Sequence, residues 1–549
     1  MTSILFVCFY NYLFFFGRNV LKIISKKNKT IDKIFVDENL RIFYPIFSLF
    51  LIGNIIIILN FLFPITIIFP FILAITVIFM FYGLVDNLRV INYLFLIKNI
   101  FIPGILSISV YGSRLHYDSG AYHLNNQLWI RESNLVIGLS NIIQNYGFSS
   151  ISEYLSSVLW FNNNFIFIFF FNLIFFTLYF NFLFENLFEK TSNFLRNSSI
   201  VLIIYSFIDN FGFNGGGNGT LYFQTVSKPD MPMATVFIIT TLLLFNSLMK
   251  KEYEKKYLYL YIYLVFFAIQ IKLFAIYLTL PLLIYIYFYR KEKNLSAMNI
   301  IFENKILLIF VLSWMSKNIF VSGCLFYPVE FTCFSSLSWY ESGDAEELRS
   351  NISIIFSKEY FSKWFANEIN VQVYVNFLGS IVIISILNFI LFQRKQNIGK
   401  IEMIFLTFLL LIFISWMLTS PKPRWGVPIF SLFIVYTSVF FDHIKLNKSY
   451  LSILMYFCFS ISLFLTPRLY SYQFFINNLN MIYENYTLRA PEIEYEKTSY
   501  EWGVFPKDND IRCWVKIDCM FIDKNVKPEE IFGFTIFYPD KTLVELLNE

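Results

Sequence analysis

Three residues between positions 116 and 123 carry side chains that exchange protons or bind charged groups: His116, Asp118 and His123. Two of the three histidines of the chain stand here, each within five residues of the same aspartate. This pattern suits general acid–base catalysis, in which Asp118 takes a proton and the two imidazoles set its protonation. The alternative is structural, because Asp-Ser-Gly before an apolar-periodic run is also the pattern of a helix N-cap.

A helix is predicted directly after Asp118, because Leu124, Leu128 and Trp129 follow it at helical spacing. We expect this amphipathic helix to lie in the membrane interface, with Tyr122 and Trp129 as aromatic anchors. An acid placed just before such a helix lies at the membrane surface. There it can meet both a lipid headgroup and a water-soluble acceptor.

Four further charged residues are candidates for the substrate site, three of them cations that suit an anionic group, although each has a structural alternative. Arg424 stands in a short loop and offers a guanidinium that binds phosphate through two parallel hydrogen bonds. Lys272 lies within an apolar region, where an ionisable group is usually functional unless it extends to the interface. Lys228 is either part of the same site or a loop charge. Asp230 opens a hydrophobic run, so its alternative is again a helix N-cap.

The composition determines the class of protein that must position these residues. Hydrophobic residues make up 57% of the 549 positions and charged residues 15%, whereas a soluble domain is about 25% charged. Apolar runs of roughly 15 to 20 residues recur along the chain. This excludes an ordinary soluble enzyme, a disordered chain and a nucleic-acid binder. The sequence therefore predicts an all-α polytopic integral membrane protein.

The 70 phenylalanines have two explanations. They line grooves for a lipid tail, or they reflect a genome rich in A and T, which favours Phe, Ile, Asn, Lys and Tyr. The second is favoured, because Asn and Lys also crowd the loops, where no lipid reaches.

About 11 to 14 transmembrane helices are predicted. The candidate spans are 3–16, 42–60, 64–83, 90–111, 163–184, 198–208, 231–248, 257–271, 273–289, 303–320, 374–392, 401–419, 427–441 and 450–466. The short runs 3–16, 198–208 and 257–271 allow half-helices. The polar break at Gln270-Ile271-Lys272 predicts two short helices that meet there.

The distribution of basic residues orients these spans. Lys and Arg number 23 in one set of loops and 8 in the longer opposite set, which contains 112–160, 209–230, 321–370 and 420–426. The basic set is therefore predicted to be cytoplasmic and the opposite set to face outward. We expect a multi-span domain over 1–466, with loop 321–370 as a candidate lid over loop 112–160. Residues 467–549 are predicted to form a small outward segment.

Four of the six cysteines fall in segments predicted to face outward: Cys324, Cys333, Cys513 and Cys519. An even set of outward thiols fits disulfides in an oxidising compartment. Cys324–Cys333 and Cys513–Cys519 are the local pairings, although three connectivities exist. Metal binding is less favoured, because no C-x-x-C spacing occurs.

The segment Tyr117–His123 resembles a Y-D-x-G-x-Y-H motif of an uncharacterised bacterial membrane-protein family. More broadly, the chain resembles the GT-C superfamily of membrane glycosyltransferases, which carry an essential Asp in an early outward loop beside interfacial helices. The likeness to the family with the Y-D-x-G-x-Y-H motif continues in order through 129–130, 138–141, 147–148, 227–232, 322–323, 327–328, 421–425 and 513–519.

The resemblance implies a GT-C-like fold in the bacterial inner (cytoplasmic) membrane, with an active site that faces outward. It implies inverting transfer of a sugar from a polyprenyl-phosphate donor to a glycan, lipid or protein acceptor. Asp118 would be the base, assisted by His116 and His123, and the substrates would bind at Arg424, Lys272, Lys228, Asp230, Tyr122 and Trp129. Many GT-C enzymes carry a second acid, where this chain has Gly120. No cofactor is therefore predicted, and a divalent metal and the donor sugar stay open.

Two other functions remain as alternatives. A cell-surface polysaccharide polymerase or ligase also joins lipid-linked sugars, but such proteins depend on outer-loop Arg and His rather than on one early Asp. A transporter of a lipid-linked substrate would show inverted repeats and mid-membrane ionisable groups. The sequence shows no internal repeat, and Lys272 is the only strong candidate of that kind.

Overall fold

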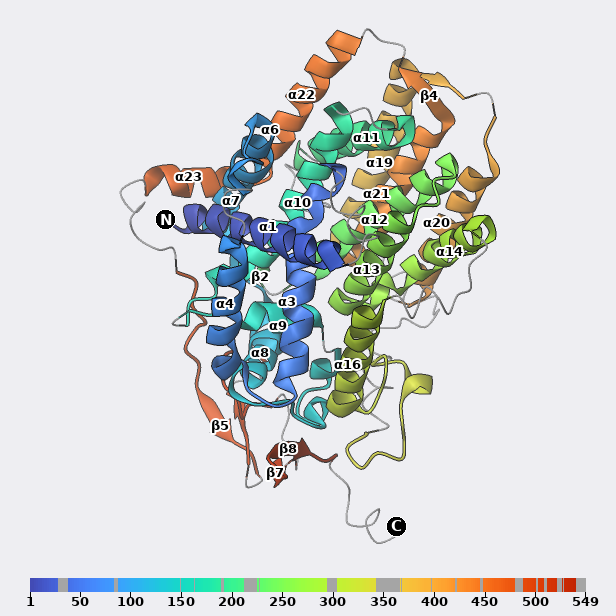
Figure 1. Ribbon diagram of the computed structural model, residues 1–549. Coiled ribbons are helices and arrows are strands. Elements are labelled where there is room, and N and C mark those ends of the chain that lie inside the picture. Colours follow the sequence, from blue (N-terminus) through green and yellow to red (C-terminus); the bar gives the residue numbers. More distant parts are fainter. Residues whose placement is uncertain are drawn as a thin grey trace.

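The computed structural model describes residues 1–27, 38–82, 87–148, 150–161, 163–188, 192–211, 225–226, 228–293, 304–341, 366, 368–395, 397–419, 422–444, 448–478, 487–499, 502–507, 511–520, 526 and 528–539. Helices dominate these residues, and the strands among them form only two-stranded sheets (Figure 1). Eight helices of the described part are long and apolar enough to cross a membrane, and four shorter apolar helices accompany them. The predicted all-α polytopic class is confirmed.

Every predicted span coincides with a helical run. These runs are α1 (Thr2–Lys27), α3 (Tyr44–Asn60), α4 (Ile65–Phe81), α6 to η3 (Tyr93–Gly112), η7 with α10 (Ile166–Ile168, Phe169–Phe188), α11 (Asn193–Phe211), α12 (Asp230–Lys250), α13 (Lys255–Ile271), η8 with α14 (Leu273–Leu278, Thr279–Lys293), α16 (Lys305–Ser322), α19 (Glu368–Leu391), α20 (Lys400–Thr419), α21 with η10 (Pro423–Tyr436, Thr437–Phe440) and α22 (Lys448–Leu465). Run 3–16 is not a half-helix, because it belongs to a continuous helix of 26 residues.

The centre of the bundle is formed by α10 and α12. Within their apolar windows 94% of the residues are buried, against 33% for α14 and α20. A helix that is apolar on all sides is typical of a buried position, and here other helices surround α10 and α12. Thus α10 and α12 position the interior, while α14 and α20 lie at the periphery.

The predicted break at Gln270-Ile271-Lys272 is confirmed. Helix α13 ends at Ile271, Lys272 is extended with φ −157° and ψ 130°, and η8 follows. The backbone carbonyl of Ile271 accepts a hydrogen bond from Ser150 Oγ at 2.6 Å. Gln270 exchanges side-chain hydrogen bonds with Asn54 of α3 at 2.8 and 3.1 Å. The bond from Ser150 satisfies a backbone carbonyl that an uninterrupted helix would pair internally, and the bonds to Asn54 satisfy the buried Gln270 side chain.

Loop 112–160 folds into short helical pieces and one strand. These are β1 (Arg114–Leu115), the π-helical turn η4 (Ser119–His123), α8 (Leu124–Glu132), η5 (Leu139–Asn141), η6 (Gln144–Phe148) and α9 (Ile151–Ser157). The prediction that Trp129 anchors this helix in the membrane interface was wrong. Most of α8 is buried, and Trp129, 7% exposed, packs edge-on against Phe537 at 5.6 Å between ring centroids. The C-terminal segment covers the face that the apolar spacing assigned to lipid.

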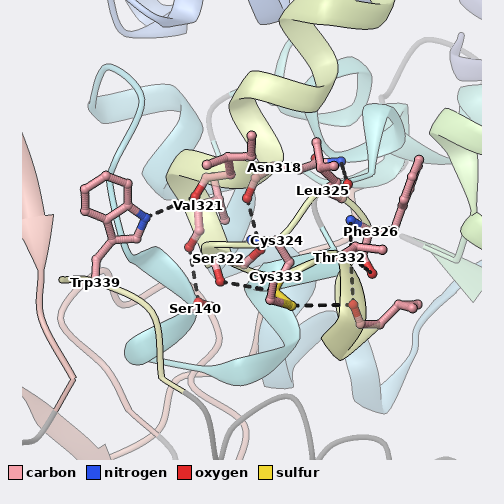
Figure 2. The surroundings of a disulfide bond; sticks show 12 residues. Ser140, Asn318, Val321, Ser322, Cys324, Leu325, Phe326, Thr332, Cys333 and Trp339 are labelled. Carbon is pink, nitrogen blue, oxygen red and sulfur yellow. Dashed lines mark hydrogen bonds between the residues drawn. A yellow bond between two sulfur atoms is a disulfide. The ribbon is translucent and has the colours of Figure 1, made fainter. Parts of the chain in front are cut away.

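The described start of loop 321–370 packs on loop 112–160 (Figure 2). The disulfide Cys324–Cys333 closes a short loop there. Ser140 Oγ donates a hydrogen bond to the Val321 carbonyl at 3.1 Å, and Trp339 Nε1 donates to the Ile319 carbonyl at 3.0 Å. Residues 342–365 and 367, half of the candidate lid, lie outside the described residues.

The C-terminal segment also packs on loop 112–160 (Figure 1). It contains α23 (Leu469–Asn477) and two antiparallel pairs, β5 (Tyr495–Lys497) with β6 (Val504–Pro506) and β7 (Pro528–Ile531) with β8 (Phe534–Phe537). The disulfide Cys513–Cys519 is the second of the predicted local pairings, and both are present. The backbone N–H of Trp514 donates a hydrogen bond to the Gly120 carbonyl at 2.8 Å. The C-terminal segment thus contacts the turn that carries Asp118.

Candidate functional site

A parallel strand pair holds the turn with Asp118 beside the start of α12. Strand β1 pairs with β2 (Thr225–Val226), two residues before Lys228. Ser119 Oγ donates a hydrogen bond to the Val226 carbonyl at 2.8 Å and accepts one from the backbone N–H of His116 at 3.1 Å. These bonds bring Asp118 and Lys228 together from segments more than 100 residues apart.

The Asp118 carboxylate faces three basic groups. Its Oδ2 lies 3.3 Å from Arg424 Nη1, 3.4 Å from Lys228 Nζ and 3.5 Å from His116 Nδ1. Although Asp118 occupies the N-cap position before η4, its side chain makes no capping hydrogen bond. The N-cap interpretation of Asp118 was therefore wrong. The carboxylate points to groups brought in from other parts of the chain.

The Asp230 carboxylate forms the second half of the site. Its Oδ1 pairs with Lys272 Nζ at the helix break, and its Oδ2 lies 3.7 Å from Arg424 Nε. Pro229 occupies the N-cap position of α12, so Asp230 is not the cap either. Lys272 is likewise held in an ion pair rather than extending alone to the interface. We call the six residues His116, Asp118, Lys228, Asp230, Lys272 and Arg424 the charge cluster.

An indole ring lies beside the cations of the charge cluster. The ring centroid of Trp425 lies 4.2 Å from Lys272 Nζ, 5.2 Å from Lys422 Nζ and 6.0 Å from Arg424 Cζ, within the range of cation–π attraction. The sequence analysis missed Trp425 and Lys422 as site residues. Their signal was that they flank Arg424 within the stretch 421–425, which carries part of the resemblance.

Burial and neighbouring charges shift the pKa values at the mouth of the cluster. Burial, together with Lys228, lowers the pKa of His116 to about 4, so its imidazole is neutral at physiological pH. Burial, together with Arg424, lowers the pKa of Lys228 to about 8. Burial alone would raise the pKa of Asp118, but Lys228 and Arg424 outweigh it and hold that pKa below its usual range. Asp118 is therefore ionised at physiological pH.

His123 belongs to a buried chain of hydrogen bonds behind the cluster. Its Nδ1 bonds Glu153 Oε1, and Glu153 Oε2 accepts a hydrogen bond from Gln127 Nε2 at 2.7 Å. Gln127 Oε1 in turn accepts from Trp160 Nε1 at 2.8 Å. His123 is thus not among the side chains that contact the Asp118 carboxylate. No spacing signal in the sequence pointed to Glu153.

Tyr122 lies between this chain and the cluster. Its ring centroid is 4.3 Å from that of His123, and its hydroxyl lies within the electrostatic reach of Asp118 and Arg424. Burial, followed by the charge of Asp118, raises the pKa of Tyr122 well above its usual range. The phenol therefore stays neutral and can act as a hydrogen-bond donor beside the cluster.

The described residues do not fit a divalent metal. They include no group of three or more His, Cys, Asp or Glu side chains placed to hold an ion. Both carboxylates of the cluster already face cations, which would repel a second positive charge.

The family described as a domain of unknown function (DUF8201) matches residues 1–431. The chain belongs to this family. The match contains every residue of the charge cluster and ends within α21, so Cys513–Cys519 and strands β5 to β8 lie beyond it. No curated protein and no solved structure matches the chain.

The charge balance of this DUF8201 site favours an anionic ligand. Four cationic side chains, namely those of Lys228, Lys272, Lys422 and Arg424, lie near two carboxylates. Within the charge cluster the Arg424 side chain is the most exposed, at 37% against 20% for Asp118. A phosphate that reaches Arg424 would meet a guanidinium, excess positive charge and an adjacent carboxylate.

Proposed function

We propose that this protein is a membrane glycosyltransferase. It would move a sugar from a polyprenyl-phosphate donor to a glycan, lipid or protein acceptor, on the outer face of a bacterial inner membrane. The supporting observation is the convergence of Asp118 with Lys228 and Arg424, which brings two phosphate-binding cations within 3.4 Å of a proton acceptor. Nucleophilic acyl transfer would instead need a nucleophile such as Ser or Cys within hydrogen-bonding distance of a general base.

In the proposed reaction the acceptor hydroxyl attacks the anomeric carbon from the face opposite the phosphate. The new bond joins the acceptor oxygen to this carbon, and the bond between the carbon and the phosphate oxygen breaks. The hydroxyl proton passes to the Asp118 carboxylate, and the bonding electrons leave with the lipid phosphate. Arg424, Lys228 and Lys272 stabilise the charge on the leaving phosphate.

Binding of the donor also affects the strength of the base. Without a ligand, Arg424 and Lys228 direct their charge at Asp118 and depress its pKa. When a phosphate draws these cations toward itself, the carboxylate loses part of that stabilisation and becomes more basic. The donor phosphate would therefore activate Asp118.

A polysaccharide polymerase or ligase is the second candidate. The observation that favours it is the presence of His116 and Arg424 beside Asp118, since those enzymes depend on such residues. The chemistry at the anomeric carbon would be the same. The acceptor would then itself be linked to a lipid.

The test is the isosteric substitution Asp118→Asn in a host strain with a defined surface glycan. The neutral amide that replaces the carboxylate cannot take the proton, so we expect glycan output to fall about 10²- to 10⁴-fold at equal expression. Glu132→Gln is the matched control, because it makes the same change on an exposed carboxylate at the end of α8. Full output from Asp118→Asn would rule out Asp118 as the base.

A further inference from the structure

A polar cavity lies at the end of the helix bundle away from the charge cluster. It has a volume of about 80 Å³ and is bounded by α1, the 3₁₀ helix η1 (Glu38–Phe43), the α6–η2 run (Tyr93–Leu96, Ile97–Phe101) and α10. One buried water needs roughly 10 to 15 Å³ measured in the same way. The cavity therefore has room for a group much larger than one water molecule.

The cavity is separate from the charge cluster. Arg41, which lines it, precedes the first residue of α3, while Asn60 at the other end of α3 bonds the Ser133 carbonyl after α8 at 3.1 Å. The 17 residues of α3 make these ends roughly 25 Å apart. In Figure 1, α6 accordingly lies in the upper part of the molecule and α8 in the lower part. Arg41, the last residue of the basic loop 18–41, lines the cavity. The charge distribution predicts that this loop, and with it the cavity, lies on the cytoplasmic side.

The cavity carries both signs of charge. Lys98 lies within the membrane-length run Tyr93–Gly112 and pairs with Glu185 of α10 at 2.8 Å. Charged groups inside such a run usually serve a function or pair with each other. Lys98 also lies in η2, a π-helical turn, and such turns are frequent at functional sites. The lining also includes Arg41, so it contains two cationic side chains, Arg41 and Lys98, and one anionic side chain, Glu185.

Asn181 adds an acceptor that no described residue satisfies. Its side chain is 1% exposed and lines the cavity. Its Nδ2 donates hydrogen bonds to the Lys98 carbonyl at 2.9 Å and to Tyr10 Oη at 3.2 Å. Its Oδ1 has no hydrogen-bond partner among the described residues. A buried acceptor without a donor is unfavourable, so Asn181 Oδ1 is a suitable acceptor for a donor group of a ligand in the cavity.

We propose that this cavity binds the headgroup of a phospholipid that carries an N–H or O–H donor. The phosphate lies toward Arg41 and Lys98, and the donor bonds Asn181 Oδ1 and Glu185. Phosphatidylethanolamine and phosphatidylglycerol meet both requirements, whereas phosphatidylcholine has the phosphate but no donor. Phe14, Ile42 and Phe95 form the apolar part of the lining, against which the start of an acyl chain packs. The site is independent of the proposed sugar transfer.

The test compares lipids with identical acyl chains and graded headgroups. The full chain, purified and delipidated in detergent, is incubated with phosphatidylethanolamine, its dimethyl derivative or phosphatidylcholine, and retained lipid is counted by native mass spectrometry. We expect phosphatidylcholine to be retained about tenfold less than the other two, because it alone lacks a donor. Equal retention of all three would overturn the proposal, as would displacement of the lipid by inorganic phosphate alone.

Two variants connect that preference to the cavity. Asn181→Leu should remove the discrimination against phosphatidylcholine, and Arg41→Gln should weaken retention of all three lipids. Arg89→Gln is the control, because it removes an exposed arginine that does not line the cavity. Wild-type discrimination in Asn181→Leu would overturn the proposal. The headgroup series on the wild-type protein decides the question if this variant fails to fold.

Discussion

The contacts of Asp118 explain why its role was ambiguous in the sequence. Asp-Ser-Gly before a helix is a local capping pattern, and Asp118 does occupy that position. Its partners Lys228 and Arg424 stand 110 and 306 positions further along the chain, beyond the reach of any local pattern. The residue types were predictable as candidates, but their assembly required the strand pair β1–β2 and the approach of α21.

At Lys228 the shifted pKa leads to a prediction for ligand binding. With a pKa of about 8, Lys228 is charged below that pH and neutral above it. A bound phosphate raises the pKa of Lys228. The contribution of the charged Lys228 to the affinity is therefore complete below pH 8, and it is lost as the pH rises through the pKa that Lys228 has in the complex. We expect the affinity for polyprenyl phosphate to fall about tenfold between roughly pH 8 and 10. Equilibrium binding across this range measures it.

The control is Lys228→Arg, since a guanidinium keeps its proton to a pKa of about 12.5 or above. This variant should bind polyprenyl phosphate with a flat profile over the same pH range. An unchanged alkaline fall in Lys228→Arg would assign the titration to another group.

On the scale of elements, the C-terminal disulfide loop supports the turn that carries Asp118. A Cβ atom on Gly120 would lie 2.7 Å from the indole of Trp514, which is itself 6% exposed. We expect Gly120→Ala to displace this ring, destabilise the protein by about 1–3 kcal/mol and reduce sugar transfer. Thermal unfolding and glycan output measure the two effects.

Gly104→Ala is the matched control, because no atom lies within 4 Å of the Cβ it would add. Within helix α7 (Ile102–Ser107) this change should leave stability unchanged or raise it by about 0.5–1 kcal/mol. Equal melting temperatures for the two variants would show that Trp514 does not restrain the Asp118 turn.

The elements that were predictable are those determined by their own sequence. Hydropathy located the spans, and the polar residues at 270–272 located the break in α13, because both depend on local composition. The environment of α8 was not predictable in this way. Its apolar spacing is the same whether lipid or protein covers it, and the covering residue Phe537 stands more than 400 positions away.

On the scale of the whole molecule, the aromatic residues form much of the interior. Phe165, which precedes η7, and Phe169, Phe175, Phe176 and Phe180 of α10 are all fully buried. An apolar cavity of about 660 Å³ also lies between α1, α3, α4 and α10, with Phe9, Phe69 and Phe170 among its lining residues. The buried rings pack the interior. The phenylalanines that line the apolar cavity are the arrangement that the lipid-groove explanation requires.

The orientation of the whole molecule gives the last prediction. The excess of Lys and Arg on one side predicts that Lys250 is cytoplasmic and that Glu132, at the end of α8, faces outward. Both side chains are exposed. In a background without the free Cys8 and Cys458, Glu132→Cys should react with a membrane-impermeant maleimide in intact spheroplasts. Lys250→Cys should react only after the membrane is permeabilised. The reverse pattern would place the charge cluster on the cytoplasmic side, where nucleotide sugars rather than lipid-linked sugars are the accessible donors, and would contradict the proposed reaction.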